Sequence, residues 1–430
     1  MTELTLSPEQ AGKIESTLIR GPVLTTFLIC FLGWMLSSMD QALFAYAIPG
    51  IARDFNVRLD SIGWILTGSF ALSGVAVVWT GSLTDHLGRR RMFVLLLATS
   101  GMLVGCIALA RSIWMLAALR ALGFASGVSL FPIATTYVVE TAPTRYRGLM
   151  SGIMQISYPI GWFASSLVAA PLIARHGWRS VFYPAFLIVP AAFLLSLFLK
   201  ESSRFEEAKL HKAGDTGLVA SGEFSPPRVS VLRNLKEVLS PELRRRTIVC
   251  FLGSFLVNVA IGGSSYLLPT FFNQSRGMSE SSATYITGIS FGIGAIGYVV
   301  ASAVGEFVLT RRNTLILWIW LGGAAFLASA WLARGYWALL AGFAVSIMLF
   351  YGSESIRTPL IGEMFPTRVR VTAVAVAGGL AVCVACIIGP LFVTKAVPHL
   401  GWSWTFTVFT VIPLLLAGLS FLFLENAPSG

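Results

Sequence analysis

Long blocks of apolar residues alternate with short polar or charged breaks along the whole chain. About 20 apolar residues in a helix cross the hydrocarbon of a bilayer, so each block predicts one membrane-spanning helix. Twelve such spans are expected, near residues 21–49, 61–84, 91–110, 113–141, 147–174, 178–200, 246–272, 281–308, 313–333, 335–363, 369–398 and 402–425. The pattern therefore predicts an all-α membrane protein.

Four short motifs of the first six spans recur in the same order in the last six. They are 29–33 with 249–253, Tyr46/Pro49 with Tyr266/Pro269, 140–147 with 363–370, and Gly177-Trp178 with Gly401-Trp402. Two related six-helix bundles are expected, which is the parallel two-half architecture of secondary transporters. The predicted division is a tail (1–20), a bundle (21–200), a linker (201–245), a second bundle (246–425) and a tail (426–430).

Composition agrees with a membrane protein, because 55% of the residues are hydrophobic and only 12% are charged. A soluble protein carries about 25% charged residues, so a water-soluble enzyme is excluded. The 41 glycines suit close helix packing in lipid, as at Gly123 and Gly127 on one helix face. No pattern of Cys, His or acidic residues indicates a disulfide framework, a metal site or a cofactor. No enzyme activity is expected.

The net charge of +11 reflects membrane topology, since Lys and Arg lie in the breaks between spans. Of the 31 basic residues, 21 fall on the side of the termini and the linker, and 8 on the other side. Basic residues are retained in the cytoplasm, so both termini should be cytoplasmic. We expect a monomer in the cytoplasmic (inner) membrane of a bacterium, with lipid, protons and a small anion as partners and no nucleic acid.

Four charged side chains fall in the middle of predicted spans, in spans one, four and ten. They are Asp40, Arg120, Glu354 and Arg357. Each charge at mid-bilayer costs roughly 2.5–3.5 kcal/mol, which favours a functional role. Their recurrence every three spans would place the three helices around one cavity.

Asp40 is a candidate proton carrier, because a carboxylate at this depth avoids the cost of a bare charge by taking up a proton. Arg120 keeps its charge and offers a planar fork matched to a carboxylate, so it is a candidate anion site. The alternative is a permanent structural ion pair between the two. Glu354 and Arg357 are three residues apart and lie on nearly the same helix face. Two interpretations stay open: Glu354 serves proton coupling and Arg357 binds substrate, or the two form a purely structural ion pair.

Span five carries a stripe of polar and aromatic side chains at helical spacing. It consists of Gln155, Tyr158, Trp162 and Ser165. Such a stripe suits substrate contact and equally suits helix packing. In span seven, Asn258 is a further candidate for substrate binding.

The junction of spans two and three reads Gly81-Ser-Leu-Thr-Asp85-His86-Leu-Gly88-Arg89-Arg90-Arg91, which resembles the Gly-x-x-x-Asp-Arg-x-Gly-Arg-Arg signature of the major facilitator superfamily. His86 replaces the usual arginine. With the twelve spans and the repeated Glu-x-x-Pro-Thr-Arg-x-Arg loops, the resemblance covers essentially the whole chain. It implies a cytoplasmic gate formed by Gly81, Asp85, Gly88, Arg89, Arg90, Glu140, Arg147, Glu363 and Arg370.

Within that superfamily the chain resembles proton-coupled symporters of aromatic and other organic acids, because Asp40, Arg120 and Glu140 stand where those carriers keep such residues. The resemblance implies proton-coupled uptake of a small organic anion by alternating access. Efflux of drugs or metabolites by proton antiport and a non-transporting nutrient sensor are the alternatives. Drug pumps of this architecture need no fixed cation, whereas Arg120 and Arg357 make the cavity attractive to anions. A sensor usually requires an added signalling domain.

The charge asymmetry makes a testable prediction about orientation. A single cysteine introduced in the 201–245 linker of a variant lacking the five native cysteines should not react with a membrane-impermeant thiol reagent in intact cells. It should react once the cells are permeabilised, because the linker is expected to be cytoplasmic. Labelling in intact cells would contradict this orientation.

Overall fold

The computed structural model describes residues 21–143, 147–199, 231–366 and 368–424, and this part of the chain consists of helices joined by short connections, without strands. The first half contains α2 (Pro22–Asp54), α3 (Leu59–Leu87), α4 (Arg89–Cys106), η1 (Ile107–Leu109), α5 (Ile113–Thr141), α6 (Arg147–His176), η3 (Trp178–Leu187) and α7 (Ile188–Phe198). The second contains α10 (Pro241–Ser264), η4 (Ser265–Leu267), α11 (Leu268–Arg276), α12 (Glu280–Phe307), α13 (Arg311–Leu332), α14 (Tyr336–Gly352), α15 (Glu354–Glu363), α16 (Arg370–Val374), η5 (Ala375–Leu380), α17 (Ala381–Phe406), η6 (Thr407–Val411) and α18 (Ile412–Leu422).

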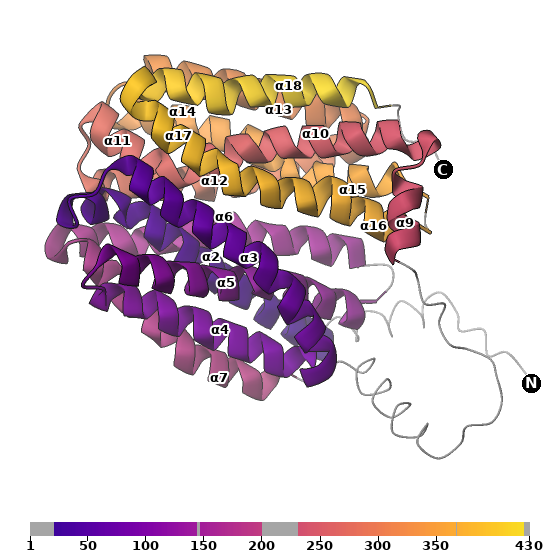
Figure 1. The fold of residues 1–430 in the computed structure, drawn as a ribbon, viewed down its shortest axis with the longest axis horizontal. Coiled ribbons are helices and arrows are strands. Elements are labelled where there is room, and N and C mark those ends of the chain that lie inside the picture. Colours follow the sequence, from indigo (N-terminus) through magenta and orange to yellow (C-terminus); the bar gives the residue numbers. More distant parts are fainter. Residues whose placement is uncertain (1–20, 144–146, 200–230, 367, 425–430) are drawn as a thin grey trace, which may run out of the picture.

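The two halves lie side by side with their helices roughly parallel to one long axis (Figure 1). A short helix from the linker, α9 (Val231–Val238), lies at one end of the bundle beside α16, and we call this the linker end. Helix α11 lies at the opposite end, which we call the far end. These two ends correspond to the two membrane surfaces.

Eleven helices of the described residues are long and apolar enough to cross a membrane, and the last of them covers Thr372–Leu422. That helix has 51 residues and would be about 76 Å long if straight, more than twice the thickness of bilayer hydrocarbon. It is broken at Gly401, whose φ of 72° is not helical. Two spans are therefore joined there, and the chain has the expected twelve-helix fold.

The same break occurs in the first half. Gly177 separates α6 from η3 with a φ of 76°, and Gly401 stands at the matching position of the sequence repeat. Only glycine adopts this region of backbone space without strain, so both halves use a glycine to turn the chain between their last two spans. The repeat seen in the sequence is thus a repeat in the structure.

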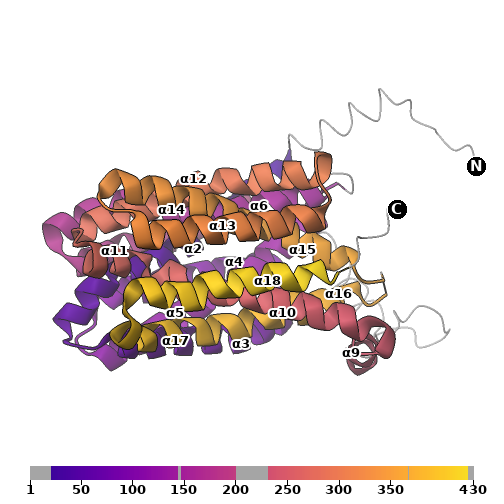
Figure 2. The same ribbon diagram turned by 90° about the horizontal axis from the view of Figure 1, so that it is seen from above.

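Two helix pairs form most of the contact between the halves. Helix α3 packs along α17, and α6 packs along α12, as Figure 2 shows from above. Helices α4, α7, α13 and α18 pack mainly within their own halves. The third and sixth spans of each half therefore lie away from the contact between the halves.

Several predicted spans are interrupted. The seventh begins at Pro241 rather than near 246, because Ser240, Pro241 and Glu242 are residues that favour a helix start. It changes to the short 3-10 helix η4 after Ser264, which follows Gly262 and Gly263. The tenth span breaks at Ser353, which separates α14 from α15. The first of these breaks places Tyr266 at the contact between the halves.

Candidate functional site

Arg120 of α5 lies in the interior of the first half and only 1% of its surface is exposed. Its guanidinium carbon lies 4.4 Å from the ring centre of Phe44 and 4.5 Å from that of Phe124. None of its three side-chain nitrogens has a hydrogen-bond partner among the described residues. Contact with aromatic faces stabilises the cation in part, but five N–H donors remain available for an anion.

Asp40 of α2 is 3% exposed and does not pair with Arg120. Ser100 of α4 donates its hydroxyl to Asp40 Oδ2 at 2.9 Å, and Asp40 Oδ1 has no partner in the described part of the chain. The permanent ion pair considered from the sequence is therefore absent from this structure. A carboxyl group with one free oxygen and one hydroxyl partner is suited to gaining and losing a proton.

Close packing of α5 brings these groups together. A Cβ atom on Gly127 would lie 2.7 Å from Ser37 Oγ and 3.0 Å from Ser100 Oγ, and one on Gly123 would lie 3.2 Å from Val104 Cγ2. These distances are too short for a larger residue. The two glycines therefore permit the close approach expected from the sequence.

An aromatic wall extends from Arg120 to the second half. Phe124 packs on Phe70 with ring centres 4.8 Å apart, and Phe70 packs on Tyr266 of η4 at 5.6 Å. Trp162 lies 5.6 Å from Tyr266 and stacks on Phe291 of α12 at 4.5 Å.

Of the predicted stripe on α6, Tyr158 and Trp162 join this wall, with ring centres 6.1 Å apart. Ser165 is buried and donates to the Trp162 carbonyl, whereas Gln155 is partly exposed and lies nearer the linker end of α6.

Tyr266 connects the halves through a hydrogen bond as well as through its ring. Its hydroxyl donates to Gln41 Oε1 at 3.0 Å, and Gln41 directly follows Asp40 on α2. The repeat partner of Tyr266 is Tyr46, whose hydroxyl instead donates to the Trp162 carbonyl at 2.8 Å inside the first half. Equivalent tyrosines thus serve different contacts, and only Tyr266 reaches across to the site.

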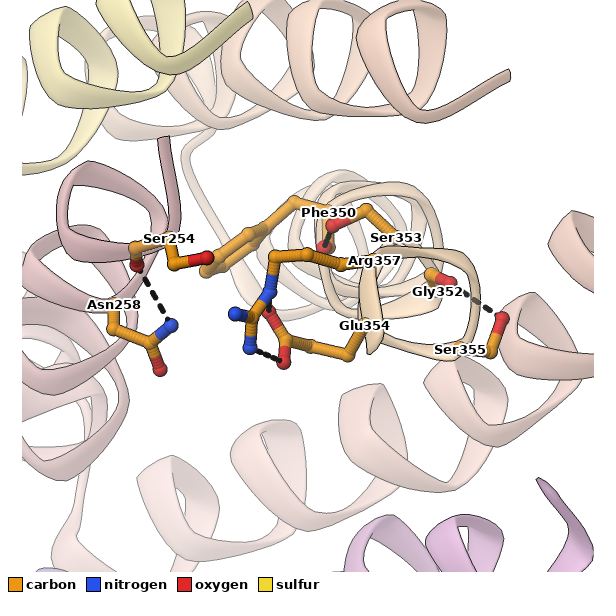
Figure 3. Close-up of polar contacts among 8 residues, drawn as sticks. All are labelled: Ser254, Asn258, Phe350, Gly352, Ser353, Glu354, Ser355 and Arg357. Carbon is orange, nitrogen blue, oxygen red and sulfur yellow. Dashed lines mark hydrogen bonds and ion pairs between the residues drawn. The ribbon is translucent and has the colours of Figure 1, made fainter. Parts of the chain in front are cut away.

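Glu354 and Arg357 of α15 pair with each other (Figure 3). Arg357 donates from Nε to Glu354 Oε1 at 3.0 Å and from a second nitrogen to Oε2. The guanidinium points toward Asn258 of α10, which itself donates to the Ser254 carbonyl at 2.9 Å (Figure 3). The structure therefore gathers three predicted residues of the second half into a second, internally neutralised cluster.

This second cluster lies at a different depth from Arg120. With the repeat offset of 223, the residue of the second half equivalent to Arg120 is Phe343. Arg357 follows Phe343 by 14 residues. Fourteen helical residues rise roughly 21 Å, toward the linker end. By this offset Arg357 lies nearer the linker end than Arg120. A cavity shared by the two clusters stays a prediction.

Several predicted gate residues lie at the linker end, where a matching ion pair occurs in each half. Arg89 at the start of α4 lies 3.3 Å from Glu140 at the end of α5. In the second half, Arg311 at the start of α13 pairs with Glu363 at the end of α15. These pairs connect helices of one half rather than the two halves.

The other predicted gate residues make varied contacts. Gly88 joins α3 to α4 with a φ of 94°, and Arg90 donates to the Ser196 carbonyl at 2.8 Å. Gly81 and Arg370 are exposed. The side chains of Asp85 and Arg147 lie outside the described residues. Their gating role stays a prediction.

The halves meet closely at the far end and diverge toward the linker end. On α3, a Cβ atom on Gly63 would overlap Thr394 of α17, one on Gly74 would lie 4.0 Å from Cys383, and one on Gly81 would meet nothing within 4 Å. The Thr67 hydroxyl donates to the Ile387 carbonyl at 2.7 Å, also across the halves.

The second contact between the halves follows the same trend. A Cβ on Gly288 of α12 would overlap Ser166 of α6, whereas Gly152, nearer the linker end of α6, has open space. At the far end, Arg53 and Glu280 form an ion pair of 2.9 Å between the halves. The structure is thus closed at the far end.

The sequence did not single out three side chains that shape the site: Ser100, Phe44 and Phe124. Helical spacing offered a signal for two of them, since Phe44 follows Asp40 by four residues and Phe124 follows Arg120 by four, and such neighbours share a helix face. Ser100 has no comparable signal. Its role depends on how α4 is rotated against α2.

The chain has two related six-helix halves that meet at the far end and diverge toward the linker end, and it buries a charged site. This arrangement defines a membrane transporter. The profile of the Major Facilitator Superfamily matches residues 30–390, and the chain belongs to this family. It is an integral membrane transporter and not an enzyme.

Relatives with known roles agree with the family. The chain is 26% identical to the cis,cis-muconate transport protein of Acinetobacter baylyi, over 81% of both chains. It is 29% identical to the gallate transporter of Pseudomonas putida, covering 81% of this chain and 80% of the relative. Among solved structures, the D-xylose-proton symporter has a TM-score of 0.72 at 18% identity, over 95% of this chain and 99% of that one. That likeness concerns the fold.

Closure of the far end predicts the effect of filling Gly63. The variant Gly63→Leu should keep the far ends of α3 and α17 apart, because its side chain would occupy the space of Thr394. Spin labels at the exposed far-end residues Arg58 and His399 should then report longer distances by pulsed electron paramagnetic resonance.

Gly152→Leu is the matched control, since a side chain there has open space and should leave the distance distribution unchanged. An unchanged distribution in Gly63→Leu would mean that α3 and α17 do not close against each other at this glycine.

Proposed function

We propose that this protein takes up a small organic acid anion by proton-coupled symport, with Arg120 as the anion site and Asp40 as the proton carrier. The observation that carries the proposal is the Arg120 guanidinium, which is buried, fully charged and without a hydrogen-bond partner among the described residues. An uncompensated buried charge is costly, so an arriving carboxylate would be bound strongly.

The separation of Asp40 from Arg120 supports a coupling mechanism. A protonated Asp40 is neutral and leaves Arg120 to the substrate carboxylate, whereas an ionised Asp40 competes for the same cation. Proton binding and anion binding therefore favour each other, which is the requirement for symport. Ser100 positions the Asp40 carboxyl, since its hydroxyl serves as donor to the ionised form or as acceptor from the protonated form.

The aromatic wall supports a flat, conjugated substrate. Tyr158 and Tyr266 supply rings with hydroxyl groups, and Trp162 supplies an indole ring with an N–H donor. Aromatic surfaces of this kind bind planar molecules by stacking. Muconate and gallate, the substrates named for the two relatives, are planar carboxylates. We therefore propose an aromatic or conjugated carboxylate as the substrate.

With the linker end in the cytoplasm, the structure corresponds to an inward-facing state. The far-end contacts between the halves would then close the external side. The hydrogen bond from Tyr266 to Gln41 would couple substrate binding beside Asp40 to the second half. The predicted gate residues at the linker end would close the internal side in the opposite state. Glu354, Arg357 and Asn258 remain candidates for contacts along the internal path.

Substitution of Arg120 tests the anion site. Arg120→Lys keeps the charge but loses the planar fork, and Arg120→Gln loses both. Loss of a hydrogen bond to a charged group costs about 1.5–3 kcal/mol, so we expect affinity for gallate or muconate to fall about 10- to 100-fold in Arg120→Gln and less in Arg120→Lys. Binding to purified protein and uptake into proteoliposomes are the measurements.

Arg334→Gln provides the control, because Arg334 is an exposed arginine at the far end. If Arg120→Gln retained parental affinity for every anionic compound that the parent transports, Arg120 would be a structural residue and the anion site would lie elsewhere.

Substitution of Asp40 tests proton coupling. Asp40→Asn keeps the size of the side chain but cannot release a proton, so accumulation driven by an imposed pH gradient should be abolished. Exchange of labelled for unlabelled substrate between preloaded vesicles and medium should persist, because exchange does not require the empty carrier to return. The partly exposed Asp60 gives the matched control Asp60→Asn, which should keep both activities.

Full accumulation by Asp40→Asn under the pH gradient would remove Asp40 from the coupling mechanism. Loss of both accumulation and exchange, with the protein still folded, would assign Asp40 to substrate binding instead.

A further inference from the structure

An apolar groove of about 420 Å³ lies between α3 and α5, at the far end of the first half. Its walls include Trp64, Gly68 and Leu72 of α3 and Ile113, Trp114 and Ala117 of α5. Neither Arg120 nor any ring of the aromatic wall lines it. The groove is therefore separate from the proposed substrate site.

The groove opens on the outer surface of the bundle. Trp114 is 82% exposed and Trp64 is 56% exposed. Tryptophans of this kind are typical of the boundary between hydrocarbon and headgroups, where their apolar rings and polar N–H groups are both accommodated. In a membrane, the surroundings of this surface are lipid molecules.

The dimensions of the groove suit one acyl chain of one leaflet. From Ser61 to Leu72, α3 lines it over 11 helical steps, or roughly 16 Å, which is about half of the 30 Å hydrocarbon thickness. An apolar cavity of roughly 150 Å³ accommodates benzene, so the larger volume here has room for a longer hydrocarbon segment.

A cation stands at the mouth of the groove. Lys395 of α17 is exposed and its ammonium nitrogen lies 5.1 Å from the ring centre of Trp64. Arg58, next to the lining residue Val57, is 79% exposed and lies 3.7 Å from Asp60, which offsets part of its charge. Lys395 has no ion-pair partner among the described residues, so its charge is available to a headgroup phosphate.

We propose that this groove binds an acidic phospholipid of the far-end leaflet, with one acyl chain between α3 and α5 and the headgroup phosphate at Lys395. The groove belongs to the first half and Lys395 to the second, and in this structure the two meet where the far ends of α3 and α17 are in contact. The bound lipid therefore bridges the halves and stabilises the far-end-closed state.

Native mass spectrometry of the purified protein with equimolar phosphatidylglycerol and phosphatidylcholine tests the proposal. The parent should retain phosphatidylglycerol with about fivefold preference, the effect of one basic residue at a membrane surface. Lys395→Gln should abolish that preference while retaining lipid. Gly68→Leu should reduce retention of both lipids severalfold, because a side chain on Gly68 meets no atom within 4 Å and would fill the groove.

Gly152→Leu serves as the control for a leucine at an open helical glycine, and it should bind lipid as the parent does. The proposal is overturned if Gly68→Leu retains both lipids at the parental level, or if the parent shows no preference that depends on Lys395. Lipid retention needs neither substrate nor proton, so the result is independent of whether the proposed symport is correct.

Discussion

A guanidinium buried in the apolar interior and unable to lose its proton is the physical constraint on which the site depends. Such a charge needs an opposite charge, hydrogen bonds or aromatic faces close by. In this protein two phenyl rings enclose Arg120, while the nearest acid, Asp40, takes its hydrogen bond from Ser100 instead. The protein thus leaves the remaining stabilisation of the cation to a ligand that supplies its own carboxylate.

The two halves share a scaffold and differ in their chemistry. Each half turns at a positive-φ glycine and holds its linker end with an arginine–glutamate pair, Arg89–Glu140 in one and Arg311–Glu363 in the other. Asp40 and Arg120, however, have Ala260 and Phe343 as their repeat partners. A symmetric scaffold lets the halves rock against each other, and an asymmetric site places the anion mainly on one of them.

Small residues make the closure of the far end possible. Gly63 and Gly288 admit Thr394 and Ser166 from the opposite half, so backbones approach more closely than larger residues would allow. The contact is local, since α3 and α17 separate toward the linker end. Tyr266 connects the contact between the halves to the site. Its ring packs on Trp162, and its hydroxyl donates a hydrogen bond to Gln41, which follows Asp40.

The sequence by itself determined the class of protein and the fold. The length of the apolar blocks, the internal repeat and the signature beginning at Gly81 predicted two six-helix halves, because bilayer thickness and backbone hydrogen bonding leave a chain of this pattern few other structures. The sequence also identified Asp40 and Arg120 as candidate site residues, because burying a charge in the membrane is costly. Only the tertiary structure decided that Asp40 pairs with Ser100 rather than Arg120, and that Arg357 pairs with Glu354. Partners of this kind depend on how each helix is rotated, tilted and interrupted, and the spacing of residues along one helix does not contain that information.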